Sequence, residues 1–215
     1  MKKLITIFSF AAATLAAQQE PKTFNLLINA GITACQVHGD SYNGFHKLGG
    51  MGGVGVEYTV SGKFAPSLYI QFIQKGAQHN PNPAKGDLKA YYLNLNYVEV
   101  PLLFTYKQQR FLFDIGVSAG YLISYYEGTE LGNITGYSPF RKMEYSVKAG
   151  LGYKLSEKFY ANVRSSNSFI TIRPYQVPGQ IYYNNFIARK FNKGLYNNIL
   201  EITLGYKIKP KKKSV

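Results

Sequence analysis

A stretch of alternating apolar and polar residues, FLFDIGVSAGYLISYY at positions 111–126, constrains the fold of this chain more than any other feature. Every second residue from Phe111 to Tyr125 is apolar, and the residues between them include Asp114 and Ser118. A period of two residues is typical of a β-strand with one apolar and one polar face. The apolar face turns either toward a protein core or toward lipid, and the remaining sequence distinguishes these cases.

The same period recurs along the chain and predicts eight strands, at 24–37, 48–60, 64–77, 91–106, 111–126, 141–153, 158–170 and 197–208. Their connections alternate in length. Tight turns are expected at 61–63, 107–110 and 154–157, and long polar loops at 38–47, 78–90, 127–140 and 171–196. An even number of strands with alternating short turns and long loops is typical of bacterial outer-membrane barrels.

The grading of the apolar faces favours lipid over a soluble, lipocalin-like core. The strand at 111–126 has Phe111 and Phe113 at its turn end, aliphatic residues in the middle, and Tyr121 and Tyr125 at its loop end. The strand at 91–106 likewise has Tyr91 at one end and Phe104 and Tyr106 at the other. Aromatic residues at both ends of an aliphatic band predict the two interfacial girdles of a membrane barrel. We therefore predict an all-β, eight-stranded, antiparallel up-and-down transmembrane β-barrel.

The strand at 91–106 also changes the phase of its apolar residues. They fall at odd positions up to Tyr97 and at even positions from Val98 onward. We expect a β-bulge near these two residues, and we expect Pro101 to occupy a position without a ladder hydrogen bond.

The N-terminal residues predict export. Lys2 and Lys3 precede an apolar run at 4–15 and then small residues, a pattern typical of a signal peptide. We expect a signal peptide at 1–17, an outer-membrane barrel domain at 22–208 and a basic tail at 209–215. The formal net charge of +14 predicts anionic partners. Export makes outer-membrane lipid and lipopolysaccharide the expected partners, and no nucleic acid is expected.

Charged residues on the polar faces are predicted to meet in the lumen. By parity these residues are Glu57, Lys75, Glu99, Asp114, Glu144, Lys148, Arg164 and Glu201. Eight strands leave an interior just wide enough for side chains to fill it, so we expect a charge-paired network that closes the barrel. The alternative is a lining for a narrow pore that passes small solutes. A catalytic acid and base pair such as Glu99 and Asp114 would need a cleft or a nucleophile pattern, so we expect neither an enzyme nor a cofactor.

Other motifs carry little weight. GMGGVG at 50–55 fits a dinucleotide-binding pattern, but no helix is expected after it. We expect its glycines to relieve crowding in a strand instead. The spacing of His38, Asp40, His46 and His79 matches no metal site, so no metal is expected. Cys35 has no partner for a disulfide in this chain and is expected to be buried and inert.

The fourth loop, at 171–196, is the best candidate for contacts outside the cell. Its 26 residues combine cationic and aromatic side chains, and loops of this length are usually functional or disordered. The contact candidates are Arg173, Tyr175, Tyr182, Tyr183, Arg189 and Lys190. The alternative is an extended hairpin that only caps the barrel.

Several stretches resemble the outer-membrane β-barrel family of Bacteroidota, whose members are described as porin-like or PorT-like. The most specific are LNYVEVPLL and GDSYNGFHK, with weaker likeness in IQKGA, SSNSFITIRP and YNNILEITLGYK. The resemblance spans about residues 24–208 and implies a single outer-membrane barrel with no catalytic residues to transfer. Its PorT branch implies a further alternative, an accessory component of a secretion apparatus. Cys35, in place of a small polar residue, and the basic extension after Ile208 depart from the family pattern.

The function expected from the sequence is therefore that of an outer-membrane barrel with a closed, charge-paired lumen. It would act in envelope structure or in surface binding through its long loops.

Overall fold

The computed structural model describes residues 23–40, 42, 44–60, 62–175 and 193–210. The predicted signal peptide and residues 211–215 of the predicted tail lie outside this part of the chain. Within the described residues, no helix is long and apolar enough to cross a membrane.

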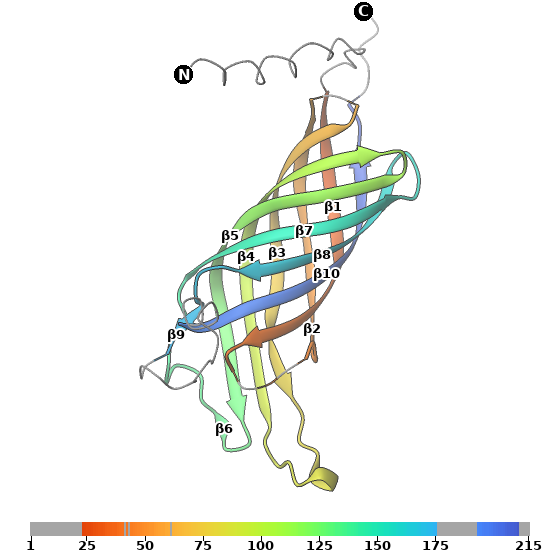
Figure 1. Ribbon diagram of the computed structural model, residues 1–215. Coiled ribbons are helices and arrows are strands. Elements are labelled where there is room, and N and C mark those ends of the chain that lie inside the picture. Colours follow the sequence, from red (N-terminus) through yellow and green to blue (C-terminus); the bar gives the residue numbers. More distant parts are fainter. Residues whose placement is uncertain (1–22, 41, 43, 61, 176–192, 211–215) are drawn as a thin grey trace, which may run out of the picture.

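Eight long antiparallel strands form a closed ring in the described residues, which confirms the predicted fold class (Figure 1). They are β1 (Thr23–His38), β2 (Lys47–Thr59), β3 (Phe64–His79), β4 (Tyr91–Gln108), β5 (Phe111–Thr129), β7 (Met143–Lys154), β8 (Phe159–Ser168) and β10 (Gly194–Ile208). Each strand pairs with the next one in this order, and β10 pairs with β1 from Leu26↔Ile208 to His38↔Tyr196. This last pairing leaves the sheet without a free edge.

Three short elements lie at the loop end of the barrel: the 3₁₀ helix η1 (Pro83–Lys85), β6 (Gly132–Asn133) and β9 (Arg173–Pro174). The loop predicted at 171–196 is shorter than expected, because β9 pairs with Gly194 and Leu195 at the start of β10. Strands β3, β4 and β5 have 16, 18 and 19 residues, whereas β7 and β8 have 12 and 10. The loop ends of β3, β4 and β5 project past the rim formed by the other strands (Figure 1).

The outer surface of the ring carries the apolar residues of the alternating pattern, for example Ile115 at 66% exposure and Leu204 at 52%. At the turn end, aromatic rings from neighbouring strands contact one another, with centroids 4.7 to 5.4 Å apart. These pairs are Phe24 with Tyr58, Phe64 with Tyr106, Phe111 with Tyr153, and Phe159 with Tyr206. An aliphatic band edged by such a girdle is suited to lipid.

The predicted irregularity occurs where the sequence placed it, but the extra residue belongs to β5. Asn96 of β4 pairs with Ser124, while Tyr97 pairs with Leu122, so Ile123 has no partner across the ladder. A bulge of this kind exchanges the two faces of the strand that contains it. The ladder between β3 and β4 is also interrupted opposite Pro101, which has no N–H to donate.

The prediction that Tyr91 and Tyr125 face lipid is wrong. Strand β4 keeps its odd-numbered residues inside along its whole barrel length, so Tyr91 is buried. The bulge at Ile123 turns Tyr125 inward against Phe140 and leaves Tyr126 outside. The physical reason is an apolar layer that fills the loop half of the lumen, formed by Val37, Met51, Ile73, Ala77, Tyr91, Leu93, Leu95, Tyr97, Leu122, Phe140, Ile172 and Leu195.

Candidate functional site

A network of ion pairs crosses the lumen at the turn-side border of this apolar layer, since Lys75 lies on β3 between Ile73 and Ala77 of the layer. Lys75 of β3 lies 3.0 Å from a carboxylate oxygen of Glu144 and 3.6 Å from one of Glu99. Strands β3 and β7 are not neighbours in the ring, so the contact between Lys75 and Glu144 joins separate walls of the barrel. The ammonium of Lys75 also lies 5.2 Å from the centre of the Tyr97 ring.

A second lysine completes the network from β7. The Lys148 ammonium lies 3.1 Å from Glu99 and also pairs with Glu201 of β10. All five side chains are about 1% exposed. Two cations and three carboxylates thus share the same section of the lumen. The remaining oxygen of Glu144 accepts a 2.8 Å hydrogen bond from Asn197. Charges this deeply buried need such partners, because desolvation otherwise makes them costly.

The remaining predicted lumen charges form separate pairs nearer the turns. Arg164 donates from Nε to Asp114 at 2.8 Å, and the Thr105 hydroxyl donates to the other oxygen of Asp114 at 2.8 Å. Glu57 does not join these groups. It lies at the turn-end mouth with Lys107 and Lys207, whose ammoniums are 3.0 and 2.8 Å from its Oε1.

All eight predicted lumen residues are buried inside the ring. The lysines at 107 and 207 were not included in the predicted set. Lys107 had been placed in a turn, but β4 continues to Gln108 and keeps Lys107 within reach of the lumen. The sequence did indicate the position of Lys207, because this residue falls on the same face of the last strand as Glu201 in the alternating pattern.

A further ion pair at the loop end was also missed. Arg173 donates from one guanidinium nitrogen to Glu127 at 2.8 Å and from a second nitrogen to the other oxygen. Its guanidinium lies 3.6 Å from the centre of the Phe140 ring, and Tyr91 donates to Glu127 at 2.8 Å. The charge of Arg173, a predicted external contact, is therefore paired with Glu127 inside the barrel. Glu127 had been placed in a loop. The bulge in β5 exchanges the two faces of the strand, so the alternating pattern before the bulge does not show that Glu127 faces the lumen.

Of the other contact candidates in the fourth loop, Tyr175 is partly buried and donates to the carbonyl of Gly39 at 3.1 Å. Tyr182, Tyr183, Arg189 and Lys190 lie outside the described residues. Cys35 is fully buried on β1, with its Sγ 3.3 Å from the Thr33 hydroxyl.

The first and second loops meet over Tyr42. Its ring stacks on His79 at 4.6 Å and on Tyr91 at 5.2 Å, and its N–H donates to Asp40 at 2.9 Å. Burial raises the pKa of Asp40 to about 6. His79 contacts Asp87 at 2.7 Å, and hydrogen bonds from Lys89 and His79 lower the pKa of Asp87. The described residues contain no group of three or more His, Cys, Asp or Glu side chains suited to a metal ion.

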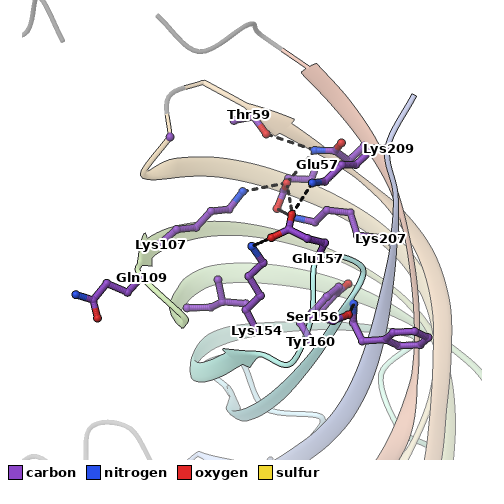
Figure 2. Close-up of a pocket in the computed structure, with 14 residues that line it drawn as sticks. Glu57, Thr59, Lys107, Gln109, Lys154, Ser156, Glu157, Tyr160, Lys207 and Lys209 are labelled. Atoms are coloured by element: carbon purple, nitrogen blue, oxygen red, sulfur yellow. Dashed lines mark hydrogen bonds and ion pairs between the residues drawn. The ribbon is translucent and has the colours of Figure 1, made fainter. Parts of the chain in front are cut away.

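The turn-end mouth opens into a cavity of about 420 Å³, called the vestibule below (Figure 2). Its lining includes two carboxylates and four lysines: Glu57, Glu157, Lys107, Lys154, Lys207 and Lys209. Hydrogen bonds from Lys154 and Lys209 lower the pKa of Glu157 to about 2. A cavity of about 30 Å³ follows beside Asp114 and Arg164. That is about the space one water occupies in the liquid, so the lumen narrows sharply inward of the vestibule.

The loop end carries a shallower groove of about 320 Å³ on the projecting strands β3, β4 and β5. Tyr92 and Tyr126 line it with ring centroids 6.1 Å apart, and Gln78, Asn80 and Thr129 add polar groups.

A ring of eight antiparallel strands with an apolar exterior and a charge-filled interior defines the class of small outer-membrane β-barrels. The comparison with protein families agrees. Residues 16–172 match the family described as "Outer membrane protein beta-barrel domain", so the chain belongs to this family. Membership places the protein in the outer membrane, in a family of barrels that are generally non-enzymatic.

Solved barrels with a similar fold have little sequence in common with this chain. Ail, the attachment invasion locus protein of Yersinia pestis, is 12% identical, with 86% of this chain and 99% of that chain covered and a TM-score of 0.48. Neisserial surface protein A is 10% identical, with coverage of 88% and 100% and a TM-score of 0.49. The N-terminal β-barrel domain of OprF from Pseudomonas aeruginosa is 9% identical, with coverage of 87% and 99% and a TM-score of 0.37. No curated protein matches the sequence.

Proposed function

We propose that this protein is a closed outer-membrane barrel that acts in envelope structure or surface binding and does not pass solutes. The contact between Lys75 and Glu144 carries this proposal, because it joins separate walls of the lumen with both side chains about 1% exposed. The apolar layer, which surrounds this pair and continues toward the loops, supports the proposal further. An ion entering the lumen would have to break buried ion pairs and then cross the apolar layer, whose loop side is held by the further ion pair of Arg173 with Glu127.

The loop end supplies the surface for binding. Beyond the apolar residues Phe72 and Val98, the outward face of β3, β4 and β5 becomes polar, with Gln74 donating to Asn96 and Asn96 to Ser124. This change is suited to the border between lipid and the sugar-rich headgroup region. Above it lie the tyrosine-lined groove and three strongly exposed apolar side chains, Leu88 at 71%, Leu131 at 91% and Tyr137 at 85%. Apolar side chains exposed to this extent on loops are available for contact with a partner. Lipopolysaccharide and outer-membrane lipid are the partners we propose.

The two roles within this proposal can be separated in cells. A deletion strain is complemented with the full chain or with a variant in which 80–90 and 130–142 are replaced by tight turns. Restored resistance to detergent with either chain supports a structural role, whereas restoration by the full chain alone supports binding through the loops. Unchanged resistance and unchanged surface adhesion in the deletion strain would rule out both roles.

A second candidate rests on the stretches LNYVEVPLL and GDSYNGFHK, which resemble PorT-like barrels of Bacteroidota. They support a role as an accessory component of a secretion apparatus. Affinity purification of the tagged protein from its native membrane tests this candidate: secretion components should co-purify with the full chain, and their absence would count against it. A narrow porin is the other alternative, and the filled lumen argues against it.

A further inference from the structure

The vestibule at the turn end has the composition of an anion-binding site that the proposed function does not use. Four lysine ammoniums converge there on two carboxylates (Figure 2). Each carboxylate pairs with two lysines: Glu57 with Lys107 and Lys207, and Glu157 with Lys154 and Lys209. The six groups together carry a net charge of +2, from four positive and two negative charges.

The ammoniums retain donors for a ligand. A lysine ammonium has three N–H donors. Lys107 directs one donor to Glu57 at 3.0 Å, and Lys154 and Lys209 direct one each to Glu157 at 2.6 and 2.8 Å. Glu57 is more fully occupied, because its Oε1 also accepts from Asn25 at 3.1 Å and from Lys207 at 2.8 Å. An oxyanion in the vestibule could therefore accept hydrogen bonds without displacing either carboxylate.

The shape of the vestibule limits what the ligand can be. Residues from seven of the eight long strands line it, including Asn25, Thr59, Lys107, Leu112, Lys154, Tyr160 and Lys207. The site thus opens at the mouth of the ring of strands, away from the lipid-facing outer surface that would hold the acyl chains of a membrane lipid. The volume of about 420 Å³ exceeds that of a bare oxyanion, and Leu112 and Tyr160 offer apolar surface for an organic group.

We propose that the vestibule binds a soluble phosphate monoester from the periplasm. A phosphate monoester carries a charge of about −1.5 to −2 near pH 7 and three acceptor oxygens, which matches the net charge and the donors of the site. Lysine binds phosphate as a point charge and needs no fixed fork geometry. The periplasmic orientation follows from the short turns at this end, where β1 begins and β10 ends.

The test is isothermal titration calorimetry of the refolded full barrel in a zwitterionic detergent, with glycerol 3-phosphate as the probe. We expect saturable one-to-one binding that weakens as salt increases, because partly exposed lysines are screened at physiological ionic strength. Glycerol at the same concentration is the neutral control and should give no binding. Absence of saturable binding of glycerol 3-phosphate overturns the proposal.

Matched variants show whether binding is local. The double variant Lys154→Gln with Lys209→Gln removes the two more exposed lysines and should weaken binding by about tenfold. The control Lys158→Gln changes charge in the same turn but does not line the vestibule, and it should bind like the wild type. An equal loss in the control would mean a general charge effect and would overturn the site.

Comparing the affinity of inorganic phosphate with that of glycerol 3-phosphate tests whether the organic part of the ligand contributes to binding. Weaker binding of inorganic phosphate than of glycerol 3-phosphate supports the role of the apolar surface at Leu112 and Tyr160. Equal affinity overturns the ester assignment. Heat-modifiable gel mobility confirms folding of each variant, so loss of binding is separated from loss of the barrel.

Discussion

Replacement of Lys148 by methionine should strongly destabilise the barrel. The Lys148 ammonium lies 3.1 Å from Glu99 and also contacts Glu201, with its side chain about 1% exposed. At 3.1 Å and an effective dielectric constant of about 20, one such contact provides about 5 kcal/mol of gross attraction. Desolvation cancels much of this gain, but removing one partner leaves buried carboxylates uncompensated. We expect Lys148→Met to lower the free energy of unfolding by about 3–5 kcal/mol.

The assay is urea unfolding of the refolded protein in lipid vesicles, followed by circular dichroism and gel mobility because the chain contains no Trp. Lys158→Met is the matched control, since Lys158 is exposed in a turn and should change stability by less than about 0.5 kcal/mol. Adding Glu201→Gln to Lys148→Met should recover part of the loss through a coupling of about 1–3 kcal/mol. Equal stability of Lys148→Met and the wild type would refute the reasoning, because it would mean that water solvates the lumen charges.

Three further predictions concern the ring and its loop end. Gly31→Ala should lower the free energy of unfolding by about 1–3 kcal/mol in the same assay, because the added Cβ would lie 2.1 Å from the Ile202 carbonyl oxygen where β1 pairs with β10. The control Gly52→Ala brings its Cβ no closer than 3.4 Å to another residue and should have a small effect, so equal effects would contradict the close packing at Gly31. Arg173→Lys should lower the free energy of unfolding by about 1–2 kcal/mol, because it loses the paired hydrogen bonds to Glu127 and the contact with Phe140. The control Arg141→Lys changes an exposed residue and should leave stability unchanged, and an unchanged stability of Arg173→Lys would contradict the pairing. The Asp40 carboxyl should titrate near pH 6 by NMR instead of near its usual pKa of 3.8, and a midpoint near 4 would refute the burial of Asp40. Because the pKa is higher in the folded loop, docking of the first loop should be strongest below about pH 4 and should weaken as the pH rises through 6.

Sequence periodicity predicts this fold well because an outer-membrane barrel has only two environments, lipid and lumen, and strands alternate between them. The faces of β7 follow the simple pattern along the whole strand, with Tyr145 and Val147 outside and Glu144 and Lys148 inside. The prediction fails for the loop half of β4 because its lumen side is apolar, whereas its outer side carries Asn94 and Asn96. Apolar residues at Leu93 and Leu95 therefore look the same whether they face lipid or a core.

The partners of the lumen charges could be predicted only in part. Parity shows that a residue faces the lumen, but the depth along the axis depends on the register and tilt of the strands. Glu57 and Glu99 thus share a face in the sequence pattern, yet Glu57 pairs at the mouth and Glu99 in the centre. The pair of Glu127 and Arg173 could not be predicted, because it depends on the bulge in β5 and on the contact of β9 with β10.

The closed lumen is the central claim, and single-channel recording of the refolded wild-type protein in a planar bilayer tests it most directly. The filled lumen predicts a silent bilayer, with folding of the inserted protein shown by its gel mobility. Discrete, reproducible conductance steps would contradict the account and would make Lys75, Glu99 and Lys148 the lining of a solute path.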